Sequence, residues 1–354
     1  MRDDRQTTVD PREVGEKTEL TKIMEEKTIH VLQSVGERYG SYQDGMPNPV
    51  EDEQFVGYEQ NAFEPFTQNI NEQLPFHNRN HSEKIVIRVE EMCEEINNSD
   101  DPSVHISEEM KAILKYAAAM HDIGQETKIV PYGHGDDENI RNYKSGTNED
   151  ISIEQALVEI EAHLQEHIAD EETKELYRNI IKHAIEGTKP KNFDLSTGTI
   201  YQQLDTEAPW QAHLIAYADI GGSSMAPETY MLEGDSFLLE QNPYILQAFT
   251  TYRDGKKVND ETKEKVEKKI KGWDKVQIGW AKGRKQMFFE GSKTEDGDNI
   301  PADISHVPDA VQKQLKKRFD KYDTSIDLAT QRQELRKDMA FEQLAENFGF
   351  AHAA

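Results

Sequence analysis

Cysteine is almost absent from this sequence of 354 residues, in which Cys93 is the only one. A single thiol excludes an intramolecular disulfide, so the fold must be stable without one, and a reducing compartment is the expected environment. Long apolar runs are also missing, and no apolar segment follows the first residues of the chain. We therefore expect no signal peptide, no transmembrane helix and no membrane partner, and a cytoplasmic location.

Basic residues are scarce relative to acidic ones. The chain has 41 Lys and Arg against 68 Asp and Glu, which gives a net charge of −27. Polymeric nucleic acid and anionic membranes need a cationic face on the protein, so the charge argues against both as partners. A small phosphorylated substrate stays compatible, because a metal ion and a few local Lys or Arg side chains can outweigh the global field.

Strand-like alternation of polar and apolar residues is nearly absent, as are GxGxxG, P-loop and CxxC motifs and internal repeats. Apolar residues recur instead every three or four positions in most of the chain, which predicts an all-α fold. The polar segments 125–147 and 189–210 are predicted to be loops.

The apolar periodicity also predicts which side chains are buried. Cys93 lies on the apolar side of its predicted helix, so we interpret it as inert packing and not as a nucleophile. Residues 311–350 are expected to form one or two helices, whose predicted buried positions are Leu315, Phe319, Leu328, Leu335, Met339, Phe341 and Leu344.

Two histidines, His77 and His81, stand four residues apart where a helix is expected to begin. If that helix starts near Pro75, both imidazoles project from one face, about a turn apart. A neutral imidazole binds divalent transition metals, and histidine is also the side chain whose proton moves most easily near neutral pH. One ring can therefore bind a metal while the other passes a proton, although such a pair alone is more often found at an ordinary surface or helix cap.

Two later segments each offer an inward-facing ligand. His121 and Asp122 stand together at the end of an apolar helical run, and Asp219 ends another run that finishes in glycine. A buried carboxylate is costly unless something positive neutralises it, and a metal ion would do so. Together with His81, these residues make a set of two nitrogen and two oxygen ligands.

The order of these segments resembles the HD superfamily of metal-dependent phosphohydrolases, over residues 75–222. The H-N-x-x-H motif is similar to that of the branch which includes the cyclic-nucleotide phosphodiesterases. Phe76 departs from the tyrosine common in that branch, and no purine-clamping Gln and Phe pair can be assigned. The expected fold is an HD-domain helical bundle with additional N- and C-terminal helices. The expected parts are an N-terminal extension (1–70), a catalytic domain (71–240) and C-terminal helices packed on it (241–354).

The resemblance implies roles for individual residues. His81, His121, Asp122 and Asp219 would be the metal ligands, and His77 the proton donor to the leaving oxygen. Candidates for a second metal or for support behind the ligands are His183 and Glu149. Candidates for substrate binding are Asn78, Arg79, Lys128 and Thr188, with Lys189 nearby; a solvated surface role explains Arg79, Lys128 and Lys189 equally well.

The resulting prediction is a metal-dependent phosphohydrolase or phosphodiesterase that acts on a small nucleotide or another phosphoester. One or two divalent ions would activate water, which Asp122 helps to orient, and Zn, Mn, Mg, Fe, Ni and Co are not distinguishable from the sequence. The alternatives are a di-iron oxygenase on the same scaffold and a non-catalytic, ligand-sensing HD protein. The intact pair His77 and His81 favours hydrolysis over the first, and the complete ligand set argues against the second. A homo-oligomer is compatible with the sequence.

Overall fold

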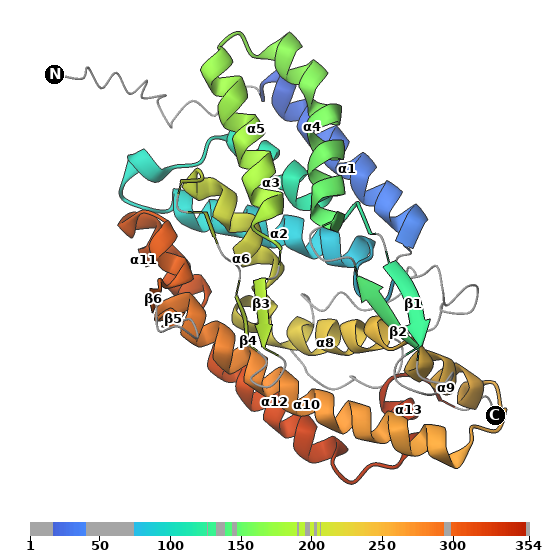
Figure 1. The fold of residues 1–354 in the computed structure, drawn as a ribbon. Coiled ribbons are helices and arrows are strands. Elements are labelled where there is room, and N and C mark those ends of the chain that lie inside the picture. Colours follow the sequence, from blue (N-terminus) through green and yellow to red (C-terminus); the bar gives the residue numbers. More distant parts are fainter. Residues whose placement is uncertain are drawn as a thin grey trace.

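The structure is a computed structural model that describes residues 17–39, 74–125, 127–131, 139–143, 147–189, 191–194, 199–201, 204–205, 207–293 and 299–351. Within these ranges the chain is mostly helical, which confirms the expected all-α class (Figure 1). In chain order the α-helices are α1 (Glu19–Tyr39), α2 (Arg79–Asn97), α3 (Glu108–Met120), α4 (Thr147–His167), α5 (Glu171–Glu186), α6 (His213–Asp219), α7 (Gly222–Met225), α8 (Pro227–Gln241), α9 (Pro243–Arg253), α10 (Asp260–Phe289), α11 (Asp309–Arg318), α12 (Tyr322–Arg336) and α13 (Phe341–Asn347). Short 3-10 helices are η1 (Pro102–Val104), η2 (Trp210–Ala212) and η3 (Asp303–His306).

Short antiparallel hairpins interrupt the helices. The pairs are β1 (Thr127–Pro131) with β2 (Asn139–Tyr143), β3 (Lys191–Asp194) with β4 (Thr199–Tyr201), and β5 (Ser292–Lys293) with β6 (Asn299–Ile300). The first two hairpins lie in segments 125–147 and 189–210, where only loop was expected. These strands are at most five residues long, which is too short for an alternating pattern to stand out from a polar loop.

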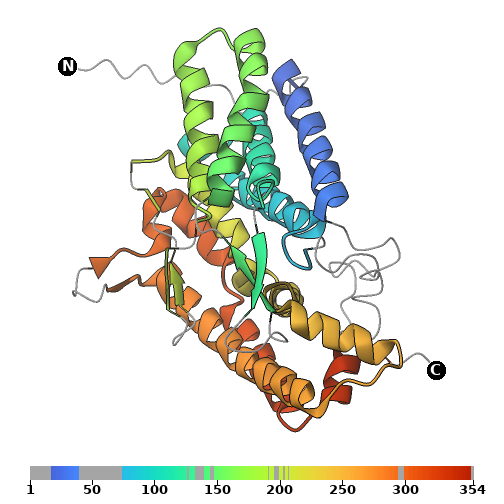
Figure 2. The ribbon, with the colours of Figure 1, turned by 45° about the vertical axis from the view of Figure 1, so that its right-hand side comes forward.

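The helices form two layers with a few helices between them. Helices α1, α3, α4 and α5 stand in one layer, and α9, α10, α12 and α13 form the other (Figures 1 and 2). Helices α2, α6 and α8 lie between the layers. Helices α2 and α6, which carry His81 and Asp219, therefore lie near the middle of the molecule.

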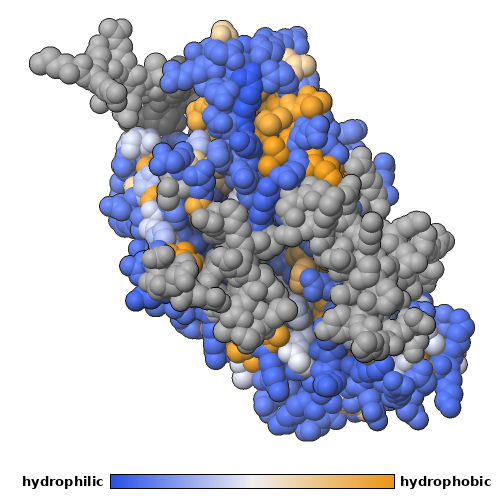
Figure 3. Space-filling model, viewed as in Figure 1, coloured by the Kyte–Doolittle hydropathy of each residue, from blue (hydrophilic) through white to orange (hydrophobic). Residues whose placement is uncertain are grey.

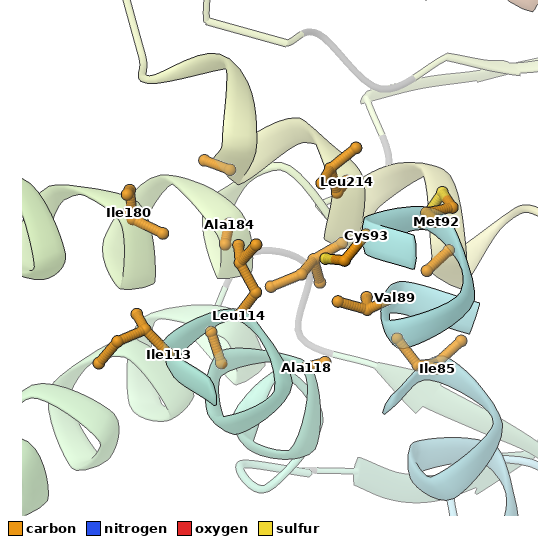
Figure 4. Close-up of a cluster of buried hydrophobic side chains, with 14 of the residues drawn as sticks. Ile85, Val89, Met92, Cys93, Ile113, Leu114, Ala118, Ile180, Ala184 and Leu214 are labelled. Carbon is orange, nitrogen blue, oxygen red and sulfur yellow. The ribbon is translucent and has the colours of Figure 1, made fainter. Parts of the chain in front are cut away.

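The first core is organised around α3, which contacts α1, α2, α4, α5 and α6. Its last turns, from Tyr116 to Met120, are 0% exposed. The three alanines among them let neighbouring helices approach closely on every side, so this helix has no solvated face at that end. The core side chains drawn in Figure 4 come from α2 (Ile85, Val89, Met92, Cys93), α3 (Ile113, Leu114, Ala118), α5 (Ile180, Ala184) and α6 (Leu214).

The segments outside residues 71–240 share this core. Helix α1, the described part of the predicted N-terminal extension, adds Leu20 and Met24 to it, and the C-terminal region adds Phe288 and Phe319. A second core joins α8, α9, the first half of α10 and α13. The long helix α10 therefore connects the two cores, and the C-terminal helices are packed onto the rest of the chain.

One expectation about the C-terminal region is wrong. Leu335 is 57% exposed, whereas Arg336, its neighbour on α12, is completely buried. Arg336 donates to both carboxylate oxygens of Asp235 on α8, at 3.1 and 2.7 Å, and to Asp274 on α10 at 3.2 Å. The buried face of α12 thus carries an arginine that forms ion pairs with carboxylates of α8 and α10. The hydrophobicity pattern of one helix does not reveal partners on other helices.

The surface agrees with the strongly acidic composition. The face in Figure 3 is mostly hydrophilic, with an apolar area over the layer that contains α1 and α4. Exposed apolar side chains on these helices include Ile29 and Val158. In the described ranges, no helix combines the length and the apolar character that a membrane span requires.

We predict that Arg336→Met lowers the free energy of unfolding by about 3–5 kcal/mol, because two buried carboxylates, Asp235 and Asp274, then share Arg332 as their one remaining cation among the described residues. Urea denaturation followed by circular dichroism measures this. The control is Lys285→Met, which removes an exposed pair with Asp323 (2.7 Å) and should change stability far less. Equal losses of stability in the two variants would contradict the assignment of Arg336 as a cation that neutralises buried carboxylates.

Cys93 should be unreactive in the folded protein. It is 0% exposed, and burial raises the pKa of its thiol to about 12. Because the thiolate is the reactive form, we expect almost no reaction with Ellman's reagent at pH 8 in buffer, and reaction of one thiol per chain in guanidinium chloride. Rapid reaction of the folded protein would show that the thiol is accessible.

Candidate metal centre

The start of α2 places the first two histidines differently from the sequence expectation. The helix begins at Arg79, not near Pro75, because Asn78 is its N-cap: the Asn78 side-chain oxygen accepts from the backbone N–H groups of Asn80 (2.9 Å) and His81 (3.3 Å). The Asn78 amide also donates to the carbonyl of Pro75 at 2.9 Å. Asn78 is 4% exposed and is used by the protein itself, so the geometry gives no support to its expected contact with substrate.

His77 lies in the turn before α2 and is held by Glu240, near the end of α8. The Glu240 carboxylate accepts from the backbone N–H groups of Phe76 (2.7 Å) and His77 (2.9 Å) and also contacts Nδ1 of the His77 ring. Burial disfavours the charged ring, but the negative charges of Glu240 and Asp122 outweigh it and raise the pKa of His77. The surroundings therefore favour a protonated imidazole at this position.

Sequence reasoning missed Glu240. One signal was present, because Glu240 follows Leu238 and Leu239 in an apolar helical run, which is the same pattern that singled out Asp219. Glu240 is 1% exposed, and its partner His77 precedes it by 163 residues.

His81, His121 and Asp122 converge on one point. Their ligand atoms all lie within 4.8 Å of one another, so this group has the spacing to hold a metal ion. Asp219 approaches the same point, with Oδ1 at 3.3 Å from His81 Nε2 and 3.8 Å from His121 Nε2. The structure thus brings together four side chains from α2, α6 and the end of α3.

The buried imidazoles of this cluster have nitrogen atoms that make no hydrogen bond. His121 Nδ1 bonds the carbonyl of Ala118 at 2.7 Å, which leaves Nε2 as the nitrogen that faces the carboxylates. Neither His121 Nε2 nor either ring nitrogen of His81 has a hydrogen-bond partner. The nearest oxygen, Asp122 Oδ2, lies 3.0 Å from His121 Nε2 but is not aligned for such a bond. Orphaned buried nitrogens beside carboxylates are what a transition-metal ion would satisfy.

The electrostatics of the cluster favour a positive charge at its centre. Burial opposes charging of His121, but Asp122 and Asp219 outweigh it and raise the pKa of His121 to about 9. For Asp122, burial would raise the pKa, but His121 and His77 keep it well below its usual value. A metal cation can supply the positive charge that these carboxylates otherwise draw from the imidazoles.

A chain of two side-chain amides orients Asp122: Gln125 bonds the carboxylate, and Asn148 bonds Gln125. Gln125 Nε2 donates to Asp122 Oδ1 at 3.0 Å, and Asn148 Nδ2 donates to Gln125 Oε1 at 3.1 Å. Next to this chain, Glu149 has a buried oxygen without a hydrogen-bond partner. Burial and the charge of Asp122 raise the pKa of Glu149, which places its carboxyl group in the field of the cluster. Glu149 therefore stays a candidate for supporting the metal site.

The structure does not bring His183 into the cluster. Among the described residues, the group with metal-ligand spacing contains His81, His121 and Asp122 but not His183. His183 Nδ1 lies instead 3.7 Å from Asp205. From the sequence, a histidine on α5 could lie either in the cluster or beside Asp205. Helical periodicity shows which face of the helix a residue is on, but it does not show which residue of another helix it contacts.

The candidate substrate-binding residues are mostly engaged elsewhere. Arg79 pairs with Glu83 at 2.6 Å on the surface of α2, and the Thr188 hydroxyl donates to the carbonyl of Ile185 at 2.7 Å. Lys189 lies 2.6 Å from Asp150. Lys128 belongs to β1, and its side chain lies outside the described residues.

Comparisons with known proteins do not decide the family. No family model, curated protein or solved structure matches this chain. The functional assignment therefore depends on the residues and their geometry.

We predict that Asp122→Ala and His121→Ala abolish metal binding. Each removes one atom of the converging group, so the loss should exceed the roughly 10–100-fold typical of changes behind the ligands. Metal content after desalting, measured by mass spectrometry, tests this. His213→Ala is the control, because His213 is equally buried (3% exposed) but lies outside the group. Full metal occupancy in either Asp122→Ala or His121→Ala would refute the site.

Proposed function

We propose that this protein is a metal-dependent phosphohydrolase built on an HD-type helical bundle, acting on a phosphodiester or a small nucleotide. The observation that carries the proposal is a histidine, His77, fixed beside a cluster with metal-ligand spacing. The ring centroid of His77 lies 6.0 Å from that of His81, and Glu240 holds the His77 ring from behind. Phosphoester cleavage needs both parts, since the phosphoryl group must be polarised and the leaving oxygen protonated.

The cluster residues would hold one divalent cation, with His81 and His121 as nitrogen ligands and Asp122 and Asp219 as oxygen ligands. Such a cation polarises a phosphoryl oxygen and lowers the pKa of water. Asp122 and Asp219 are 14% and 18% exposed at their side chains, so solvent and a substrate group can reach them. Asp122, fixed by Gln125, would orient the attacking water.

His77 would deliver the proton to the leaving oxygen. Because Nδ1 contacts Glu240, the proton available for transfer is the one on Nε2. The ring packs edge-on against Phe76, with 4.7 Å between centroids, and 6.2 Å from Phe237, which limits its rotation. Glu240 and Asp122 raise the pKa of this fixed ring, which favours the protonated form that a general acid needs.

A di-iron oxygenase is less well supported. That chemistry needs a second set of nitrogen and oxygen ligands, and the residues that the structure describes form one group with metal-ligand spacing. The direct test is a screen of metal-loaded protein against cyclic mononucleotides, cyclic dinucleotides, nucleoside phosphates and generic phosphodiesters. Absence of hydrolysis with every metal, together with two irons bound per chain, would reverse the preference.

We predict that His77→Ala keeps its metal but loses about 10²–10⁴-fold in turnover of a substrate with a sugar-alkoxide leaving group. The loss should be much smaller for a nitrophenyl phosphodiester, because nitrophenolate leaves without a proton. Steady-state kinetics on both substrates gives the comparison.

Glu240→Gln is the matched variant for this test. Glutamine still accepts the two backbone N–H bonds but removes the negative charge beside His77. It should therefore show the same dependence on leaving group with a smaller loss. Equal losses on both substrates, or loss of metal in His77→Ala, would contradict the role of His77 as the acid.

A further inference from the structure

One buried guanidinium joins the helices that build the candidate site. Arg88 lies seven residues after His81 on α2, so both project from the same side of that helix. Its Nη1 donates to the carbonyl of Ala218 at 3.0 Å, and its Nη2 lies 2.9 and 3.1 Å from the two oxygens of Glu233. Arg88 is 5% exposed, so these bonds are shielded from water.

The partners of Arg88 stand next to the residues that would do the chemistry. Ala218 immediately precedes Asp219 near the end of α6. Glu233 is on α8, seven residues before Glu240, and the two project from the same side of that helix. Arg88 therefore connects α2, which carries His81, with the ends of α6 and α8 that carry the other components.

The chain also leaves room for this arrangement. A Cβ atom on Gly222 would lie 2.6 Å from Glu233 Oε2 and 3.3 Å from Arg88 Nη2. Any larger residue at position 222 would therefore push against the pair. This explains one of the two glycines that follow Asp219, which the sequence pattern showed but did not account for.

Stability alone is a poor reason for a charged pair in this position. A buried ion pair contributes little net stability, because desolvation offsets the attraction, and apolar side chains of similar volume are often as stable. What the guanidinium provides is fixed geometry, since its planar donors bind a carbonyl and a carboxylate at set angles. The Ala218 carbonyl also accepts from the N–H of Gly221 at 3.2 Å, so both bonds fix the turn that ends α6.

We infer that Arg88 is a positioning residue of the metal site, which sets Asp219 relative to His81 by holding the Ala218 carbonyl. This inference rests on the proposed metal site. Loss of the Arg88 bonds frees the end of α6, so Asp219 no longer sits at a defined distance from the other ligands. The expected consequence is weaker metal binding by a folded protein.

The test is the affinity of metal-free protein for Co²⁺, measured by calorimetric titration well below the melting temperature. Arg88→Met should bind Co²⁺ about 10–100-fold more weakly than the wild type, as is typical when a group that orients a ligand is removed. Arg88→Lys keeps the charge but cannot bridge both partners, so a smaller loss is expected. If Arg88→Met does not fold, the Co²⁺ affinity of Arg88→Lys is the measurement that tests the inference.

The matched control is Arg332→Met. Arg332 is 7% exposed and likewise binds a carbonyl, of Met231 (2.9 Å), and carboxylates, of Asp235 (3.1 Å) and Asp274 (3.2 Å), but these contacts join α12 to α8 and α10. This variant should melt at a lower temperature and keep its Co²⁺ affinity. Unchanged affinity in the folded Arg88 variant, or an equal loss in Arg332→Met, would overturn the inference. Failure of the wild type to bind Co²⁺ would instead overturn the metal site itself.

Discussion

The interaction on which this structure depends most is the pairing of buried carboxylates with groups from distant segments. An ionised carboxylate that leaves water loses solvation worth several kcal/mol, so it is tolerated only where another segment supplies a cation or N–H donors. Helix α8 shows the constraint three times. Glu240 binds the turn of His77, Glu233 binds Arg88 of α2, and Asp235 binds arginine from α12. These pairs fix α8 between the two layers, so the position of His77 is set by the charges that surround this helix.

The residues of the candidate metal cluster could be predicted from the sequence, whereas their supporting partners could not. His121 and Asp219 end apolar helical runs, so the pattern alone shows that they face inward. Glu240 and Arg88 act through partners 163 and 145 residues away, and no local pattern records such a distance. His183 shows the converse limit: its helix was predicted correctly, but its position beside Asp205 depends on how the helices pack.

Two local expectations failed for a related reason. In each case a polar side chain with a specific hydrogen-bonding partner decides the structure, where the expectation was based on apolar residues. The start of α2 was placed near Pro75, but the capping bonds of Asn78 begin the helix at Arg79. On α12, Leu335 was expected inside and Arg336 was not considered, although the arginine is the buried residue. In both places a specific hydrogen-bonding partner outweighs the average preference of the residue type, and that partner is visible only in three dimensions.

The two halves of the proposed chemistry depend on different parts of the packing. His81, His121, Asp122 and Asp219 come from helices of the first core, which the apolar side chains around α3 hold together. His77 is outside that set, because its ring is fixed by α8, and α8 is in turn tied to the C-terminal layer. In the proposed chemistry, the geometry of the metal ligands and that of the acid are therefore fixed separately, and Arg88 connects the two parts, since it binds both the end of α6 and α8. A cation can be held by four groups at the right distances, but productive protonation also requires the leaving oxygen, the metal and the acid to share one geometry. In the proposed chemistry the C-terminal helices then have a defined role: they hold α8, the helix whose Glu240 fixes the proposed acid, His77.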